Sequence, residues 1–149
     1  MSDPHPATLL RLLNISSLPA QPWKNGGGTT REVLCHPQHA GYEHFDWRIS
    51  LAQIQTSGDF SRFPGIDRHI MLIEGDNMQL IHDQHVHVLH PFQPYAFAGE
   101  DKMACLLPLG PTQDLNLMLR RGRAQGSLHA WQGRSDSMKL AAGTHFLYA

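Results

Sequence analysis

The segment with the most unusual residue types is 22–32, PWKNGGGTTRE. Three consecutive glycines are costly to order, so a folded chain keeps them where φ must be positive or where another group approaches the backbone closely. The N–H groups of such a turn can form a concave anion site, with positive charge from Lys24 and Arg31 and hydroxyl donors from Thr29 and Thr30. The segment lacks the residue order of a phosphate-binding P-loop. It therefore indicates either an anion-binding turn or a plain hairpin loop.

A second group of polar residues alternates with leucines in segment 114–121, DLNLMLRR. As a strand, this segment places its leucines on one face and Asn116, Met118 and Arg120 on the other. In a closed barrel, an arginine that faces the lumen can pair with a carboxylate in a bidentate way. The alternative is that the leucines fill the core while Asn116 and Arg120 lie in water.

Two further arginines raise the same question. In segment 46–54, DWRISLAQI, Arg48 and Ser50 alternate with apolar residues and therefore share one face of a strand. Arg68 follows a turn-like segment and is preceded by Asp67, which could neutralise it. Each arginine is either a ligand-binding group in a lumen or a solvated surface cation.

Four histidines, His82, His85, His87 and His90, lie within nine residues. On one continuous strand His85 and His87 share a face, opposite the other two. Imidazole pairs at this spacing bind zinc, iron or manganese. The Gly-x5-His-x-His-x3–4-Glu pattern of metal-binding cupins is incomplete, because no glutamate follows until Glu100. We therefore expect a histidine-rich surface hairpin without a resident metal, and His85 and His87 are the residues that would hold one.

The composition narrows the class of protein. The chain has 149 residues, of which 41% are hydrophobic and 17% charged, which suits one compact domain spanning 1–149. A net charge of −1 without a basic run argues against nucleic acid as a partner. Two cysteines cannot make a disulfide framework, and no segment has the pattern of a membrane span or a signal peptide. We expect a cytoplasmic protein with no membrane partner.

Turn residues recur about every ten positions with short periodic segments between them, which is typical of an all-β sandwich or barrel. We expect strands at 46–54, 69–73, 78–90 (one or two strands), 95–97, 103–109, 114–121 and 139–149. Helix is scarce, because ten prolines are spread along the chain. The candidates are a short helix or first strand at 7–14 and single turns at 16–18 and 60–63.

Together these segments resemble the HutD/Ves family. The resemblance rests on PWKNGGGTTRE at 22–32, WRISLA at 47–52, GxFSxFPGxxR at 58–68, FxG at 97–99 and DLNLMxR at 114–120. It implies an all-β, cupin-like double-stranded β-helix, or jelly-roll barrel, without the usual metal ligands and with no cofactor. Some members lie among histidine-utilisation genes, and the family is thought to sense or buffer an acidic intermediate such as N-formylglutamate or urocanate. Members usually continue with a further C-terminal hairpin, so either the final residues are not included in this sequence or this barrel is short of a strand pair.

Carried over by this resemblance, the ligand-binding candidates are Lys24, Asn25, Gly26, Gly27, Gly28, Thr29, Arg31, Arg48, Arg68, Asn116 and Arg120. The function that the resemblance favours is a regulator that binds a small anionic ligand. Two other classes stay open. One is a cupin-type enzyme, either metal-dependent or an isomerase, that acts on a small carboxylic acid. The other is a protein that docks a partner, including a second copy in a homodimer, through an edge strand.

Overall fold

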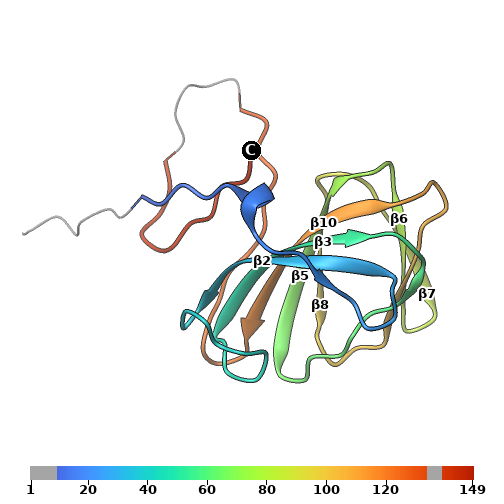
Figure 1. Ribbon diagram of the computed structural model, residues 1–149, viewed down its shortest axis with the longest axis horizontal. Coiled ribbons are helices and arrows are strands. Elements are labelled where there is room, and N and C mark those ends of the chain that lie inside the picture. The colour runs from blue at the N-terminus through green and yellow to red at the C-terminus, as the bar shows by residue number, and fades with distance from the viewer. Residues whose placement is uncertain (1–9, 134–138) are drawn as a thin grey trace, which may run out of the picture.

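Two antiparallel sheets pack against each other in the computed structural model, which describes residues 10–133 and 139–149 (Figure 1). The larger sheet has the strand order β1 (Gln21–Pro22), β2 (Gly28–His36), β3 (Trp47–Ile54), β10 (Thr112–Arg120), β5 (Ile66–Glu74) and β8 (Pro94–Ala98). The smaller sheet has the order β4 (Gly58–Asp59), β9 (Met103–Leu106), β6 (Met78–His82) and β7 (His85–Leu89). From β3 onward the chain crosses repeatedly between the sheets, as in a jelly roll. The predicted all-β fold with very little helix is confirmed.

The core between the sheets is apolar at one end. Buried side chains of the larger sheet, among them Ile54, Ile70 and Leu72, pack there against Met78 and Leu80 of the smaller sheet. Each of these five side chains is almost fully buried. Because apolar burial is the main favourable term in folding, this cluster is what holds the two sheets together.

The outer face of the larger sheet is also covered. Its buried cluster consists of Val33, Ile49, Leu51, Leu115, Leu117 and Leu119. Residues from both ends of the described chain pack against this cluster, namely Leu13, Ile15 and Leu18 and then Ala124, Leu128 and Phe146. Figure 1 shows the N-terminal segment in blue and the C-terminal segment in orange and red on this side of the barrel.

The strand expected at 139–149 is wrong. These residues form no strand in the structure, and Phe146 instead packs on the leucine cluster while Leu147 is exposed. An apolar run close to the C-terminus has the same composition as a strand, but it becomes one only when a ladder partner is available.

The other strand predictions match β3, β5, β6, β7, β8, β9 and β10, with shifts at their ends. The turn expected at 16–18 is present as the 3-10 helix Ile15–Ser17. Residues 60–63 form an extended loop in place of a turn, and residues 10–14 have no regular structure, while 7–9 lie outside the described residues. Strand β2 was not predicted, because its glycine-rich start indicated a loop. Among the described residues, no helix is long and apolar enough to cross a membrane.

The histidine-rich segment is a hairpin, and this corrects the predicted faces. Asp83 and Gln84 form its two-residue loop, and both have positive φ, as in the turns that favour tight hairpins. The loop reverses the chain, so His82 of β6 lies directly across from His85 of β7. The expectation that His82 faces away from His85 and His87 assumed one continuous strand and is wrong.

Candidate functional site

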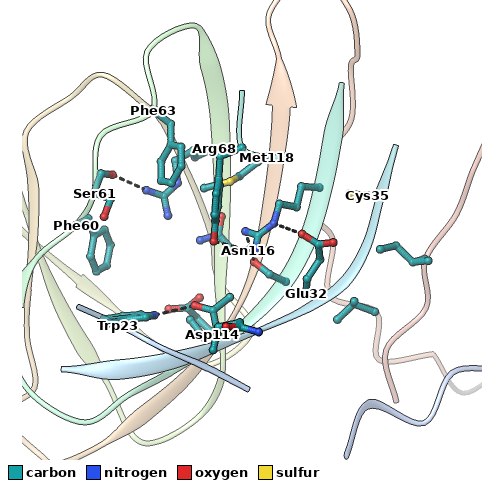
Figure 2. A pocket seen from close by; sticks show the side chains of 18 of the residues that line it. Trp23, Glu32, Cys35, Phe60, Ser61, Phe63, Arg68, Asp114, Asn116 and Met118 are labelled. Atoms are coloured by element: carbon teal, nitrogen blue, oxygen red, sulfur yellow. Dashed lines mark hydrogen bonds and ion pairs between the residues drawn. The ribbon is translucent and has the colours of Figure 1, made fainter. Parts of the chain in front are cut away.

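A cavity of about 1110 Å³ lies on the inner face of the larger sheet, beyond the apolar end of the core (Figure 2). Strands β2, β3, β5 and β10 supply its floor and wall, and the segments 19–25 and 59–63 supply its rim. Its volume lies just above the range of about 300–1,000 Å³ that is typical of small-molecule sites. The cavity is therefore the natural candidate site of this chain.

Two arginines form the floor of the cavity in one cross-strand row. Met118 of β10 lies directly opposite Arg48 of β3 on one side and Arg68 of β5 on the other. Residues directly opposite each other share a face and lie about 5 Å apart, so the row places the two arginines about 10 Å apart at their Cα atoms. Both arginines are buried. Two buried guanidinium groups thus face the same space.

Arg48 is held by polar neighbours. Its Nε donates to Glu32 Oε2 at 2.8 Å, and its two terminal nitrogens lie 3.4 Å from the hydroxyls of Ser50 and Tyr42. The guanidinium carbon also lies 4.8 Å from the centre of the Tyr42 ring. These contacts fix the orientation of the guanidinium at the wall of the cavity.

Arg68 is the less satisfied of the two arginines. One terminal nitrogen donates to the carbonyl of Ser61 at 3.3 Å, while the buried Nε has no partner. Aromatic rings surround the guanidinium, with the Phe97 ring centre 4.9 Å and the Phe63 ring centre 5.3 Å from its carbon. Burial and the nearby Arg48 charge lower the pKa of Arg68, but arginine remains a cation at neutral pH. Figure 2 shows this side chain lying between Phe63 and Met118.

Asp114 and Asn116 continue the polar face of β10 into the cavity. Both are buried, and Asp114 Oδ1 and Asn116 Oδ1 have no hydrogen-bond partner. Burial raises the pKa of the Asp114 carboxyl to about 7, against the opposing effect of the Arg68 charge. A carboxyl group with this pKa exchanges a proton near neutral pH, so it can donate or accept a hydrogen bond within the cavity.

Charges of both signs line the cavity. The cationic residues are Arg11, Lys24, Arg48, Arg62 and Arg68, and the acidic ones are Glu32, Asp59 and Asp114. The cations are in excess, but Glu32 already occupies one edge of Arg48. The cavity therefore suits an anion that also carries polar groups for its acids.

The glycine loop is a rim element and not an anion nest. Lys24 and Asn25 line the cavity, whereas the three glycines lie outside its lining. The N–H of Gly26 donates to the Trp23 carbonyl, and the N–H of Gly27 donates to the Asn25 side chain at 2.9 Å. The N–H groups of Gly26 and Gly27 are therefore hydrogen-bonded within the loop and do not point into the cavity.

Local geometry accounts for two of the three glycines. Gly26 has φ of +73°, which favours glycine. A Cβ on Gly28 would collide with the Gln53 carbonyl oxygen and lie 3.2 Å from the Trp23 ring. The close approach seats the Trp23 indole at the cavity, where its N–H donates to the Thr30 hydroxyl at 2.8 Å.

Three further candidates lie away from the cavity. Thr29 and Arg31 alternate with Thr30 along β2 and so face outward, and Arg31 Nε donates to the Leu18 carbonyl at 3.1 Å. Arg120 shares the face of Asn116 but lies beyond the end of the cavity, where its Nε donates to the Phe45 carbonyl at 2.7 Å. The expectation that Arg31 and Arg120 converge on the pocket is therefore not met, because each binds a backbone carbonyl elsewhere.

Residues of the cavity that sequence reasoning missed include Asp114 and Glu32. A signal for Asp114 was available, because it lies two positions before Asn116 and must share its face of β10. The place of Glu32 depends on the register of β2 against β3, in which Glu32 lies opposite Ser50. Three aromatic residues of the rim, Trp23, Phe60 and Phe63, lie in motifs that carry the family resemblance, but no pattern in the sequence indicated that they line a cavity. Tyr42, in the loop between β2 and β3, lies in none of these motifs.

The donor set of the cavity does not suit the metal ion that many barrels of this shape hold. Guanidinium groups dominate its floor, and they cannot act as metal ligands because they have no free lone pair. The described residues that line the cavity include one imidazole, that of His39, in the loop between β2 and β3. We therefore derive no metal chemistry in this cavity.

Comparison with known proteins identifies relatives of the chain. A family model described as HutD matches residues 15–149. A protein of Pseudomonas putida, described as an uncharacterized 21.2 kDa protein in the hutC 3′ region, is 39% identical over 94% of this chain and 73% of its own length. Protein Ves of Escherichia fergusonii is 39% identical over 74% of this chain, and the chain spans 58% of its length.

Solved structures agree with this assignment. HutD from Pseudomonas fluorescens SBW25 is 42% identical with a TM-score of 0.66, over 70% of this chain and 56% of that structure. A sugar phosphate isomerase of the cupin superfamily from Silicibacter pomeroyi has a TM-score of 0.55 at 18% identity, over 74% of this chain and 76% of that structure, a likeness of fold alone. The predicted cupin-like fold is thus confirmed. The chain belongs to the HutD family.

Proposed function

We propose that the chain binds a small carboxylic acid in the cavity between its sheets. The observation that carries this proposal is the row in which Arg48 and Arg68 flank Met118 on the cavity floor. Two buried guanidinium groups that repel each other are stabilised when an anion lies between them, and each can bind a carboxylate in a bidentate way.

The unpartnered polar atoms support the same conclusion. In residues 10–133 and 139–149, five buried side-chain polar atoms have no hydrogen-bond partner, and three of them belong to the cavity residues Arg68, Asp114 and Asn116. Leaving a buried polar group unsatisfied costs about 1–3 kcal/mol. A fold tolerates this cost where a ligand or ordered water completes the hydrogen bonds.

The ligand we propose is an acidic intermediate of histidine utilisation, and the role is regulatory. The family match and the hutC 3′ region named for the Pseudomonas putida relative support this context. N-formylglutamate has two carboxylates, one for each arginine. Urocanate has one carboxylate, and its imidazole suits the acidic side of the cavity near Asp114.

Isothermal titration with N-formylglutamate, urocanate and glutamate tests the proposal. We expect binding that Arg68→Met weakens at least about tenfold, because a charge-assisted hydrogen bond contributes about 1.5–3 kcal/mol. Arg31→Met is the matched control, since Arg31 lies on strand β2 of the same sheet and faces away from the cavity. Absence of both a heat of binding and a rise in Tm at millimolar ligand contradicts the proposal, because binding to the folded state must stabilise it.

The Asp114 carboxyl favours a second candidate, an enzyme that moves a proton on a small carboxylic acid. A pKa of about 7 is the value expected of a general acid or base at neutral pH. In D₂O, such an enzyme exchanges a C–H proton of its ligand for deuterium, which NMR detects. Exchange that is abolished by Asp114→Asn supports the enzyme, and binding without exchange supports the regulator.

A further inference from the structure

The β6–β7 hairpin gathers imidazoles at a second place, the open edge between the sheets. His82 of β6 lies directly across from His85 of β7, and His87 lies two residues further along the same face of β7. A hollow of about 290 Å³ lies over this face, lined by His82, Asp83, His85, Val86, His87 and Tyr95. The hollow does not depend on the cavity described above, and the proposed function makes no use of it.

Two carboxylates converge on one nitrogen of His82. Its Nε2 lies 2.9 Å from Asp101 Oδ2 and 3.6 Å from Asp83 Oδ2. These three atoms all lie within 4.8 Å of one another. Ligand atoms that each bind a metal at about 2.0–2.2 Å in a tetrahedral site are roughly 3.4 Å apart. Small side-chain movements therefore place an ion within bonding distance of all three atoms.

A second layer of contacts holds these candidate ligands in place. The other ring nitrogen of His82, Nδ1, lies 2.9 Å from the Tyr95 hydroxyl. The backbone N–H of Ala98 donates to Asp101 Oδ2 at 3.1 Å. Metal-binding histidines almost always have such a partner on the second nitrogen, because it fixes the tautomer and the ring orientation. With Nδ1–H donating to Tyr95, the lone pair of Nε2 faces the carboxylates.

Solvent can reach this cluster without fully hydrating it. The side chains of His82 and Asp101 are 24% and 28% exposed, and that of Asp83 is 70% exposed. An ion could enter from the open side. His85 faces the same hollow but is not among the residues whose ligand atoms lie within 4.8 Å of one another, so its side chain must turn towards them to supply a fourth ligand.

We propose that His82, Asp83 and Asp101 bind a divalent first-row transition-metal ion at the edge of the barrel, with His85 completing the site. Imidazole and carboxylate ligands together suit Zn²⁺, Co²⁺ and Ni²⁺. An ion there ties β6, β7 and the turn after β8 together. The competing explanation is a metal-free hydrogen-bonded chain from Tyr95 through His82 to Asp101.

Competition for Zn²⁺ between the untagged full chain and a chromophoric chelator tests the site. We expect one tightly bound ion per chain. Asp83→Asn is the most informative variant, because the side chain is exposed and asparagine tolerates the positive φ at this position. It should weaken Zn²⁺ binding at least about tenfold, and Tyr95→Phe should weaken it about 10–100-fold.

His90→Gln is the matched control, since His90 follows the same strand, is exposed and does not line the hollow. It should bind Zn²⁺ as the unaltered chain does. With Co²⁺, the visible absorption of the bound ion should be lost in Asp83→Asn and kept in His90→Gln. Unaltered affinity in both Asp83→Asn and Asp101→Asn, or an equal loss in His90→Gln, overturns the proposal, because scattered surface histidines then hold the ion.

Discussion

The inner and outer faces of the larger sheet carry opposite chemistry, although the same strands build both. On β10, Asp114, Asn116 and Met118 face the cavity, while the leucines between them face outward. Both faces are buried, the outer one by segments from the two ends of the chain. The outer face of β10 is apolar from Leu115 to Leu119, whereas the inner face buries charges and leaves polar atoms without partners.

This difference separates stability from function along a single strand. The leucine face gains free energy from each apolar contact that its covering segments make. The inner face loses free energy wherever a charge or a polar atom is buried without a partner. Loss of an outer leucine should therefore lower stability, whereas loss of a buried charge that lacks a partner on the inner face should raise it.

The largest expected effect is the loss of a leucine from the outer face. Leu115→Ala should lower the free energy of unfolding by about 2–5 kcal/mol, because it removes buried apolar contacts and leaves a void. Urea denaturation measures this, and Leu109→Ala, at a position where the side chain is 62% exposed, is the control. An unchanged midpoint for Leu115→Ala would show that the end segments do not cover this face in solution.

On the inner face, Asp114→Asn should change how stability depends on pH. The carboxyl has a pKa of about 7 in the fold, above the ordinary value of 3.8, so folding retains its proton in this window. Its contribution to stability is therefore present below about pH 4 and is lost as the pH rises towards about 7. We expect that the variant lacks this decline and is roughly 2–4 kcal/mol more stable than the unaltered chain at pH 8. Urea denaturation across pH 4–8 measures both, and parallel profiles would contradict the prediction.

Arg120 tests where the cavity ends. Arg120→Met removes the hydrogen bond to the Phe45 carbonyl and should cost about 1–3 kcal/mol of stability. The affinity for a carboxylic acid should stay the same, because Arg120 does not line the cavity. A weakened ligand affinity with unchanged stability would contradict this prediction and show that Arg120 belongs to the ligand site.

The smallest effect should come from Glu32, which competes with a bound acid for Arg48. Glu32→Gln should strengthen the binding of a carboxylic acid about 2–5-fold. Arg48 is buried but the Glu32 side chain is 42% exposed, and ion pairs that solvent reaches contribute about 0.2–1 kcal/mol. Raising the salt concentration should reduce this gain, because mobile ions screen the charges. Weaker binding in Glu32→Gln would show that Glu32 is itself a ligand contact.

The alternation of β3 and β10 could be predicted from the sequence, because period-2 patterning is a local property. Whether Arg48 and Asn116 face the lumen or solvent could not, because it depends on how the two sheets pack. The position of Arg120 beyond the end of the cavity could not, since it depends on where the loop that carries Phe45 crosses the barrel. The face of His82 was predicted wrongly because a two-residue turn reverses the chain within the pattern, whereas the shared face of His85 and His87 was predicted correctly. The face of Asp114 could have been predicted by the same alternation rule that puts Asn116 on its face of β10.

The place of β10 in the sheet also sets an order for folding. It is the last strand in residues 10–133 and 139–149, yet it pairs with β3 and β5 on its two sides. Until residues 112–120 have left the ribosome, β3 and β5 lack their common neighbour and expose unpaired edges. Such non-local pairing is slow to form. When β10 inserts between β3 and β5, it places Arg48 and Arg68 on either side of Met118. The cavity floor and the middle of the larger sheet therefore form in the same step.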